Sequence, residues 1–248
     1  MDNTIFFLAG NTPVLPYMQH LLTTHGAQVA KQPEPDVTHL LLPVPSFEAD
    51  GRIKGGGILE HILADLPEDV TIIGGNLQHP ALQGYHTIDL LQDNAYLAEN
   101  AAITADCAIR VAGTHLKTVF RHCPVLVIGW GRIGKCLSSI LKAMDCDVIV
   151  AARKETDLHT LRSMGFSCVP AKRAADLLPN MKLVFNTAPA PIFSHEDLST
   201  CASNCVLIDL ASKPGMIGNK VIQALALPGK HTPEATAQLI YRCILRYI

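Results

Sequence analysis

The chain has 248 residues, a formal net charge of −2 and 48% hydrophobic residues. It is therefore long enough for two α/β domains and too apolar for a disordered protein. The small net charge gives no reason to expect nucleic acid as a partner. No apolar run reaches the roughly 18 residues that a membrane span needs, and no stretch resembles a cleavable leader, which predicts a cytoplasmic protein without a membrane partner.

Eight cysteines are present, and most lie inside segments that look like core. This placement favours free thiols over disulfides. The only close pair is Cys201 and Cys205. No further ligand near this pair completes a zinc site, so no metal centre is expected.

The N-terminal third alternates short apolar runs with helical patterns, which predicts a small parallel sheet. The expected strands cover residues 4–9, 37–42, 70–73 and 87–93, and the expected helices begin near Pro16 and at Ile58. The loops after the first three strands span residues 10–13, 43–57 and 74–79. Loops of this kind gather at the carboxyl edge of the sheet, where open α/β sheets bind ligands.

Residues 99–116 carry alanine and other apolar side chains at helical spacing. We expect a helix that connects two domains. Thr104, followed by Asp106, is a candidate N-cap, so the regular helix is expected to begin there. Asn100 and Thr104 at this start are candidate substrate ligands.

The most informative stretch is an apolar strand, Pro124 to Ile128, that runs directly into Gly129-Trp130-Gly131-Arg132-Ile133-Gly134. A helical pattern follows. G-x-G-x-x-G between a strand and a helix is typical of a dinucleotide site. The first glycine permits the tight turn, the second lets the backbone approach a pyrophosphate, and the third lets helix and strand pack closely. All six residues are candidate cofactor ligands.

Further strands are expected at 147–152, 166–169, 183–186 and 205–210, with a shortened one at 224–227. Thr232 and Pro233 are expected to start a last helix as N-cap and first helical residue. The fold is thus predicted as α/β, a Rossmann-type doubly wound parallel sheet preceded by a smaller flavodoxin-like α/β domain. The expected organisation is an N-terminal substrate domain over 1–98, a linking helix over 99–118, an NAD(P)-binding domain over 119–229, and a C-terminal helix over 230–248 that packs back on the N-terminal domain.

The tip of the second strand of the nucleotide domain indicates which cofactor binds. NAD-specific sites place an acidic residue there to bond the ribose hydroxyls, whereas this chain has Arg153 and Lys154. Two cations suit a 2′-phosphate, so NADP is favoured over NAD. In the alternative, these are solvated loop charges and Glu155 or Asp157 meets the ribose.

Three later segments lie where a bound cofactor or substrate would pass. Asn186-Thr187-Ala188-Pro189 follows the fourth strand, and the alternative for it is a simple proline turn. Ser212 is a candidate cofactor ligand. Lys213 is a candidate for catalysis and for binding an anionic substrate, while Asp209 either contributes to the site or organises the turn.

His231 precedes the last helix and is a candidate proton acceptor, with an exposed loop histidine as the alternative. The sequence has no G-x-S-x-G, no Walker lysine loop and no paired catalytic carboxylates, which leaves hydrolase and kinase functions without support.

The combination of Gly129–Gly134, Ala152-Arg153-Lys154, Asn186–Pro189, Ile208–Gly215 and Leu227-Pro228-Gly229 resembles the A subunits of dipicolinate synthase. The resemblance covers most of residues 99–240 and is weaker before them. It implies a two-domain enzyme, similar to formate/glycerate-type dehydrogenases, that oxidises dihydrodipicolinate to dipicolinate with NADP⁺ during sporulation. It further implies a small cyclic dicarboxylate substrate and, as partner, a flavoprotein-like B subunit; a homodimer is compatible with this class.

Two departures from the family bear on turnover. The segment after Gly215 is abbreviated, and Lys230-His231 stands where the family has apolar residues. The alternatives are therefore a related dehydrogenase of another amino or hydroxy acid, and a nucleotide-binding regulatory subunit without catalysis.

Overall fold

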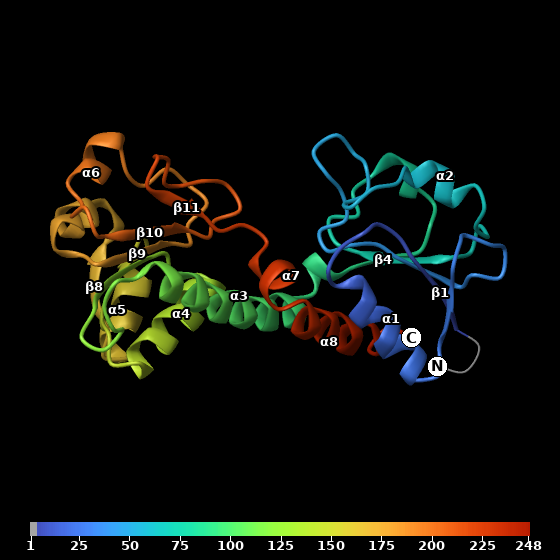
Figure 1. Ribbon diagram of the computed structural model, residues 1–248, viewed down its shortest axis with the longest axis horizontal. Coiled ribbons are helices and arrows are strands. Elements are labelled where there is room, and N and C mark those ends of the chain that lie inside the picture. The colour runs from blue at the N-terminus through green and yellow to red at the C-terminus, as the bar shows by residue number, and fades with distance from the viewer. Residues whose placement is uncertain (1–3) are drawn as a thin grey trace. The chain divides into compact units, whose positions relative to one another are not determined.

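The computed structural model describes residues 4–248. The chain divides into two compact units (Figure 1). The first contains the residues up to Asn100 together with Pro228–Ile248, and the second contains Ala101–Leu227.

The first unit is built on a five-stranded parallel sheet of order β2-β1-β3-β4-β5. Its elements are β1 (Ile5–Leu8), α1 (Leu15–Thr24), β2 (Gln28–Ala30), β3 (His39–Leu41), α2 (Leu59–Leu63), β4 (Thr71–Gly74), β5 (Thr87–Asp89), α7 (Leu227–His231, with Leu227 at the boundary) and α8 (Pro233–Ile244). The sequence missed β2, a three-residue edge strand with only one large apolar side chain. The strand expected at 87–93 ends at Asp89, because a 3-10 turn follows.

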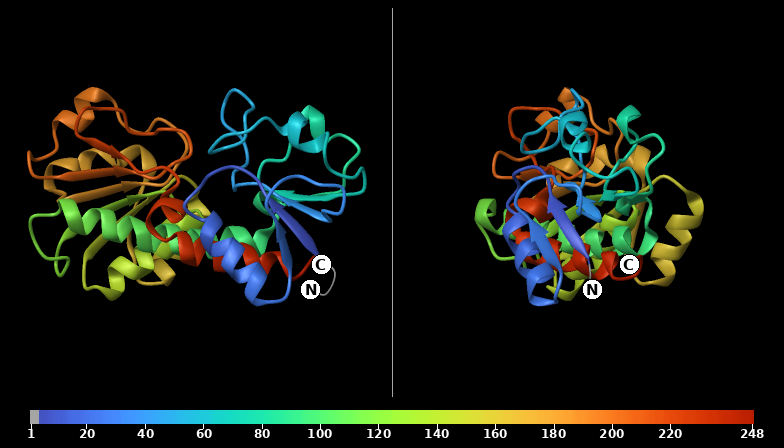
Figure 2. Two further views of the ribbon diagram at one scale, coloured as in Figure 1. Left: turned by 45° about the vertical axis from the view of Figure 1, so that its right-hand side comes forward. Right: turned by 90° about the vertical axis from the view of Figure 1, so that its right-hand side faces the viewer.

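Helix α8 packs on α1 within this unit (Figure 2). The ring of Tyr241 lies 4.8 Å from that of His25. The buried stripe of α8 includes Leu239, Ile240 and Cys243. Burial of such an apolar stripe is what stabilises a helix of this length.

Asp93 ties the end of the chain to the start of α3 (Asn94–His115). Its Oδ1 accepts hydrogen bonds from the backbone N–H groups of Ala95 and Tyr96, at 2.8 and 3.1 Å. Its Oδ2 accepts from Arg246 and from the Tyr247 hydroxyl. Burial acts to raise the pKa of Asp93, but these hydrogen bonds outweigh it and leave the pKa lowered.

The second unit holds a six-stranded parallel sheet of order β11-β10-β9-β6-β7-β8. After α3 its elements are β6 (Pro124–Ile128), α4 (Arg132–Ala143), β7 (Asp147–Ala152), α5 (Glu155–Ser163), β8 (Ser167–Pro170), β9 (Leu183–Asn186), α6 (His195–Ser199), β10 (Val206–Asp209) and β11 (Val221–Gln223). The predicted α/β, Rossmann-like architecture is confirmed.

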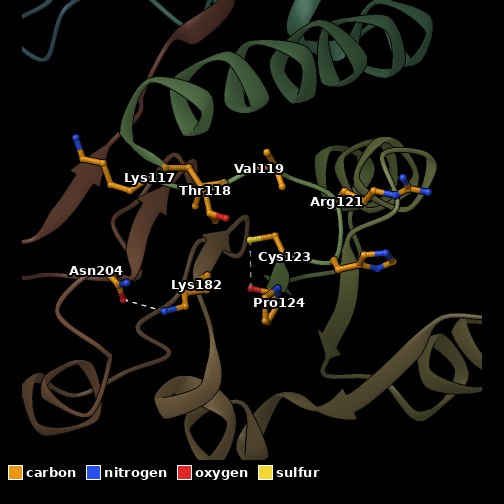
Figure 3. Close-up of a pocket in the computed structure, with 10 residues that line it drawn as sticks. Lys117, Thr118, Val119, Arg121, Cys123, Pro124, Lys182 and Asn204 are labelled. Carbon is orange, nitrogen blue, oxygen red and sulfur yellow. Dashed lines mark hydrogen bonds between the residues drawn. The ribbon is translucent and has the colours of Figure 1, made fainter.

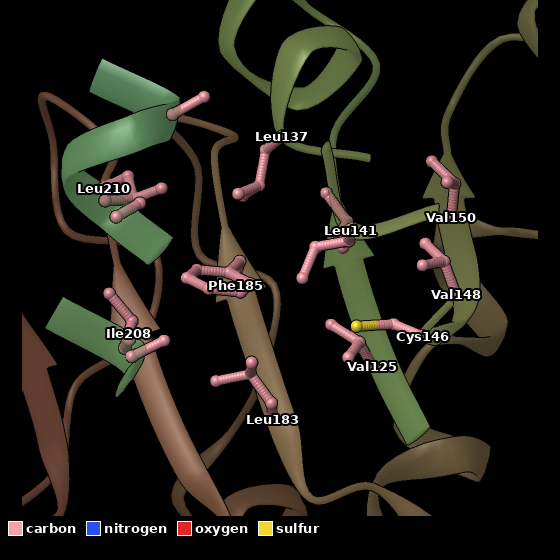
Figure 4. Packing of buried hydrophobic residues seen from close by; sticks show 14 of the residues in the cluster. Val125, Leu137, Leu141, Cys146, Val148, Val150, Leu183, Phe185, Ile208 and Leu210 are labelled. Atoms are coloured by element: carbon pink, nitrogen blue, oxygen red, sulfur yellow. The ribbon is translucent and has the colours of Figure 1, made fainter. Parts of the chain in front are cut away.

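Both faces of this sheet are buried, as all-parallel sheets require. Val125 packs on one face with Leu137 and Leu141 of α4 (Figure 4), and Val127 belongs to the same buried cluster. Leu126 and Ile128, which alternate with the valines, pack on the other face. This doubly covered sheet explains why the strands are continuous apolar runs in the sequence.

Three local expectations were wrong. The shortened last strand lies at 221–223 rather than 224–227, and the residues from Leu227 to His231 form the short helix α7. Helix α3 begins at Asn94, so Thr104 is a buried residue in its middle and not its N-cap. The alanine-rich composition of 95–108 propagates the helix through Thr104 without a new cap.

Candidate functional site

The glycine-rich turn between β6 and α4 has the geometry of a dinucleotide loop. Gly129 has φ 102°, a left-handed conformation that favours glycine. A Cβ on Gly129 would lie 2.5 Å from the Thr187 Oγ1, and one on Gly134 would lie 2.2 Å from the Gly129 carbonyl oxygen. The first and third glycines are therefore required by the packing of the turn itself.

Gly131 differs from both of its partners. A Cβ built on Gly131 would meet nothing within 4 Å, and the residue has φ −79°, which any residue can adopt. No contact with residues 4–248 therefore explains this glycine. The open space lies at the amino-terminal end of α4, where the N-cap Gly131 has no side chain to accept a hydrogen bond. Its N–H groups and the helix dipole favour a phosphate there, so the residues present fit a dinucleotide pyrophosphate.

The other residues of the loop lie differently. Trp130 is buried and packs edge to face on Phe166 at 5.6 Å. The Lys135 ammonium lies 5.8 Å from the centre of the indole. Arg132 is exposed, and Ile133 is half-buried against the core. The indole of Trp130 therefore contributes to the core, while its backbone belongs to the loop.

Arg153 and Lys154 follow β7 directly, and both are exposed. Among residues 4–248, no carboxylate lies within ion-pair distance of either side chain. Of the two acidic alternatives, Glu155 contacts His159 at 3.5 Å and Arg162 at 4.0 Å along its own helix. The strand tip thus presents two cations whose charge no described residue neutralises.

Asn186 and Thr187 use their side chains within the protein. Asn186 is fully buried, and its Nδ2 donates to the Ala188 carbonyl at 3.0 Å and to Asp209 at 2.9 Å. Its Oδ1 accepts from the Ala188 N–H at 3.1 Å. The Thr187 hydroxyl donates to the Ile128 carbonyl at 2.8 Å. These side chains hold the 186–190 loop beside Gly129, and any contact with a cofactor falls to the exposed parts of the loop, which include Pro189.

Asp209 organises the loop after β10. Its carboxylate is fully buried and accepts from Asn186 and from the N–H groups of Ala211, Gly215 and Met216, at 2.9, 3.0, 2.7 and 2.7 Å. Gly215 lies so close that a Cβ on it would be 2.4 Å from the Asn186 Nδ2. Of the two roles considered for Asp209, the structure supports organisation of the turn.

Ser212 and Lys213 lie in that loop and are exposed. They are available to a ligand, in contrast to the buried Asn186 and Asp209. The remaining predicted residues lie elsewhere. Asn100 is half-buried in α3, Thr104 is buried in its middle, and His231 is exposed at the end of α7 in the first unit.

In the first unit, the loops after β1, β3 and β4 meet at the carboxyl edge of the sheet. A Cβ on Gly10 would lie 2.4 Å from the Lys54 carbonyl oxygen, which brings the first loop against the second. The fully buried Ser46 accepts from the Gly75 N–H at 2.9 Å and donates to the Pro43 carbonyl at 2.8 Å, which ties the second loop to the third. The sequence missed Ser46, whose only signal is its place within a proline-rich loop.

Burial dominates the chemistry of the cysteines. All eight are free thiols. Burial raises the pKa of Cys205 to about 12 and that of Cys146 to about 11. Within residues 4–248, no group of three or more histidine, cysteine or acidic residues is arranged to hold a metal ion. No helix in this range is long and apolar enough to cross a membrane.

Known proteins are similar to the second unit in sequence and to the whole chain in fold. Residues 105–226 match the family described as "D-isomer specific 2-hydroxyacid dehydrogenase, NAD binding domain". The A subunit of dipicolinate synthase from Bacillus subtilis (strain 168) is 26% identical over an alignment of 149 residues that covers 57% of this chain. The matched stretch spans half the length of that relative.

Two solved structures share the fold over the whole chain. The A subunit of dipicolinate synthase from Bacillus halodurans superposes with a TM-score of 0.85 and 20% identity, covering 99% of this chain and 98% of that one. Its counterpart in the dipicolinate synthase of Bacillus subtilis superposes with a TM-score of 0.81 and 19% identity, covering 100% and 96%. The predicted resemblance to this family is confirmed, and the match over residues 105–226 supports a dehydrogenase-type domain that binds a nicotinamide cofactor.

Proposed function

We propose that this protein is an NADP-dependent oxidoreductase, because it has a dehydrogenase-type nucleotide domain and is similar to the A subunit of dipicolinate synthase. Its proposed reaction is the oxidation of dihydrodipicolinate to dipicolinate in sporulation. The observation that carries the nucleotide part is Gly131, whose missing side chain leaves an open space at the amino-terminal end of α4. Arg153 and Lys154, without carboxylate partners among residues 4–248, support NADP over NAD.

The chain's own residues divide the work of binding. The N–H groups at the start of α4 hold the pyrophosphate, and Arg153 and Lys154 clamp the 2′-phosphate. Asp209 and Asn186 fix the two loops that border the nicotinamide end, and the exposed Lys213 meets a substrate carboxylate.

The nicotinamide supplies a hydride acceptor when it is bound. Loss of one hydride and one proton converts the dihydropyridine dicarboxylate into an aromatic ring, and this aromatisation provides the driving force. Lys213 and His231 are the alternative proposed acceptors of the proton, and Lys213 can accept it only as a neutral amine that does not pair with the carboxylate.

The reaction is tested by following NADPH formation with dihydrodipicolinate as substrate, using the full chain alone and then together with a flavoprotein-like B subunit. Formation of NADPH at a rate proportional to the amount of chain supports the proposal. If the chain binds NADPH but forms none under either condition, the enzymatic proposal fails.

A second candidate is a nucleotide-binding regulatory subunit without turnover. The observation that favours it is that Asn186 and Asp209, polar side chains at the carboxyl ends of β9 and β10, are both fully buried and engaged with the protein. In the second unit, this leaves Lys213 as the main candidate for chemistry. Binding of nucleotide without NADPH formation would favour this alternative over a dehydrogenase of another amino or hydroxy acid, which would oxidise a different substrate.

A further inference from the structure

The second unit has a pocket of about 370 Å³ at the amino-terminal ends of its strands (Figure 3). Its walls come from the segment between α3 and β6, from Lys182 just before β9, and from Asn204 in the turn before β10. The glycine-rich loop follows the carboxyl end of β6, so the pocket lies at the opposite edge of the sheet from the nucleotide site. The lining residues are Leu116, Lys117, Thr118, Val119, Arg121, His122, Cys123, Pro124, Lys182 and Asn204.

The pocket is lined by cations and by no acid. Three of the ten lining residues are Lys or Arg, one is His, and none is Asp or Glu. This imbalance occurs in a chain whose formal net charge is −2. Asp145 lies 3.6 Å from Arg121 and offsets that charge at the rim. Asp147 also lies at this edge, where burial first and then the charge of Asp147 raise the pKa of Cys123. The lysines Lys117 and Lys182 form no ion pair with either aspartate.

Lys182 is fixed by hydrogen bonds of its backbone and of its ammonium group. Its N–H donates to the Pro124 carbonyl at 3.1 Å, and its carbonyl accepts from the Val206 N–H at 2.9 Å. Its ammonium donates to the Asn204 Oδ1 at 3.2 Å. An ammonium has three N–H donors, so further donors remain for a ligand. Among residues 4–248, neither Lys117 nor Lys182 has a carboxylate within ion-pair distance.

Neutral donors complete the set. The Thr118 hydroxyl lines the pocket on the side of Lys117, while Lys182 and Asn204 lie on the other side (Figure 3). Because the Oδ1 of Asn204 is used by Lys182, its Nδ2 is the atom that can donate to an oxygen. Ammonium, hydroxyl and amide donors that line one pocket favour an oxyanion.

We infer that this pocket is a second ligand site, separate from the nucleotide site, that binds a small multivalent oxyanion. Phosphate groups and clustered carboxylates share the required chemistry, since each brings several acceptor oxygens and more than one negative charge. The volume is that of a small-molecule site rather than of a single bound ion. Lys117 and Lys182 supply the positive charges that attract the anion, and Thr118 and Asn204 fix the orientation of the anion.

Amide hydrogen exchange of the full chain tests the site, with pyrophosphate and citrate as separate probes at constant ionic strength. Either probe is expected to slow exchange across residues 116–124. Protection by pyrophosphate alone identifies a phosphorylated ligand, and protection by citrate alone identifies a polycarboxylate. Because the start of α4 is also a candidate phosphate site, protection is read at 116–124 and not from total binding. If neither probe slows exchange there, the inference is wrong.

Charge-removal variants separate a site from general attraction. Lys117→Ala and Lys182→Ala should each weaken binding of the protecting probe by about tenfold, as expected for one charge-assisted contact. Lys31→Ala removes one exposed cation from the first unit and should change the affinity by less than about twofold. Equal losses in all three variants would show bulk screening and overturn the site. Polyglutamate is a polyanion too large for the pocket. If polyglutamate binds while neither pyrophosphate nor citrate slows exchange across residues 116–124, the site is also overturned.

Discussion

Asn186 donates a hydrogen bond of 2.9 Å from its Nδ2 to the Oδ1 of Asp209, and both side chains are fully buried. The two residues end neighbouring strands in register, β9 and β10. Each also binds the backbone of the loop that follows its strand. One buried contact therefore positions both loops that border the proposed nicotinamide site.

Asp209→Asn is expected to destabilise the second unit. An amide in place of the carboxylate has one oxygen for the four donors that now share two, and its own NH₂ would face the N–H groups of Gly215 and Met216. We expect the free energy of unfolding to fall by about 3 kcal/mol, typical of breaking a buried charged network. Urea unfolding followed by Trp130 fluorescence measures this change.

Asp176→Asn is the matched control, because Asp176 is an exposed carboxylate of the same unit that pairs with Arg173 at 3.0 Å. Its loss should cost less than about 1 kcal/mol. Similar costs for the two variants would contradict the organising role of Asp209.

This pair also shows how far the sequence reaches. The apolar runs and G-x-G-x-x-G predict the sheet and the glycine-rich turn correctly, because burial of both sheet faces and a left-handed Gly129 leave direct marks in the residue pattern. The partners of Asp209 could not be predicted, since its hydrogen bonds go to backbone groups whose positions depend on the tertiary fold. Likewise, Thr104 is a residue type that favours N-caps, but the helix starts ten residues earlier and Thr104 lies inside it.

Substitutions at two glycines of the loop should separate ligand binding from folding. Gly131→Ala adds a methyl group to open space at an ordinary φ, so stability should change by less than about 0.5 kcal/mol. The methyl group would occupy the space proposed for the pyrophosphate, and the affinity for NADPH should fall at least about tenfold.

Gly134→Ala, in contrast, should lower the stability of the protein. Its Cβ would lie 2.2 Å from the Gly129 carbonyl oxygen, and overpacking of this kind costs about 1–3 kcal/mol. Thermal unfolding and NADPH titration of both variants test the pair. An unchanged NADPH affinity in Gly131→Ala would contradict the position assigned to the pyrophosphate.

Arg153→Ala should discriminate between the two nicotinamide cofactors. If the guanidinium binds the 2′-phosphate, NADPH affinity should fall about tenfold more than NADH affinity, because a charge-assisted contact is worth about 1.5–3 kcal/mol. Arg162→Ala removes an equally charged side chain from the exposed face of α5 and should affect both cofactors alike. Equal losses of NADPH and NADH affinity in Arg153→Ala would reject the 2′-phosphate role. Calorimetric titration is the suitable measurement, because the buried Trp130 packs on Phe166 rather than facing solvent.

His39 should make the stability of the first unit depend on pH. Burial, followed by the nearby His86, lowers the pKa of His39. The imidazole ring stacks on Phe6 at 4.8 Å, and its Nδ1 lies 2.8 Å from the Thr38 hydroxyl. The unfolded chain therefore takes up the proton at a higher pH than the folded chain does.

The contribution of His39 is complete above the unfolded pKa of about 6.5 and is lost as the pH falls through the lower, folded pKa. The slope can reach about 1.4 kcal/mol per pH unit. Urea unfolding followed by circular dichroism between about pH 7.5 and about pH 5.5 should show a steeper loss for the native chain than for His39→Gln. The exposed His20 on α1 provides the control: His20→Gln should retain the native slope, and a native slope in His39→Gln would assign the pH dependence to other groups.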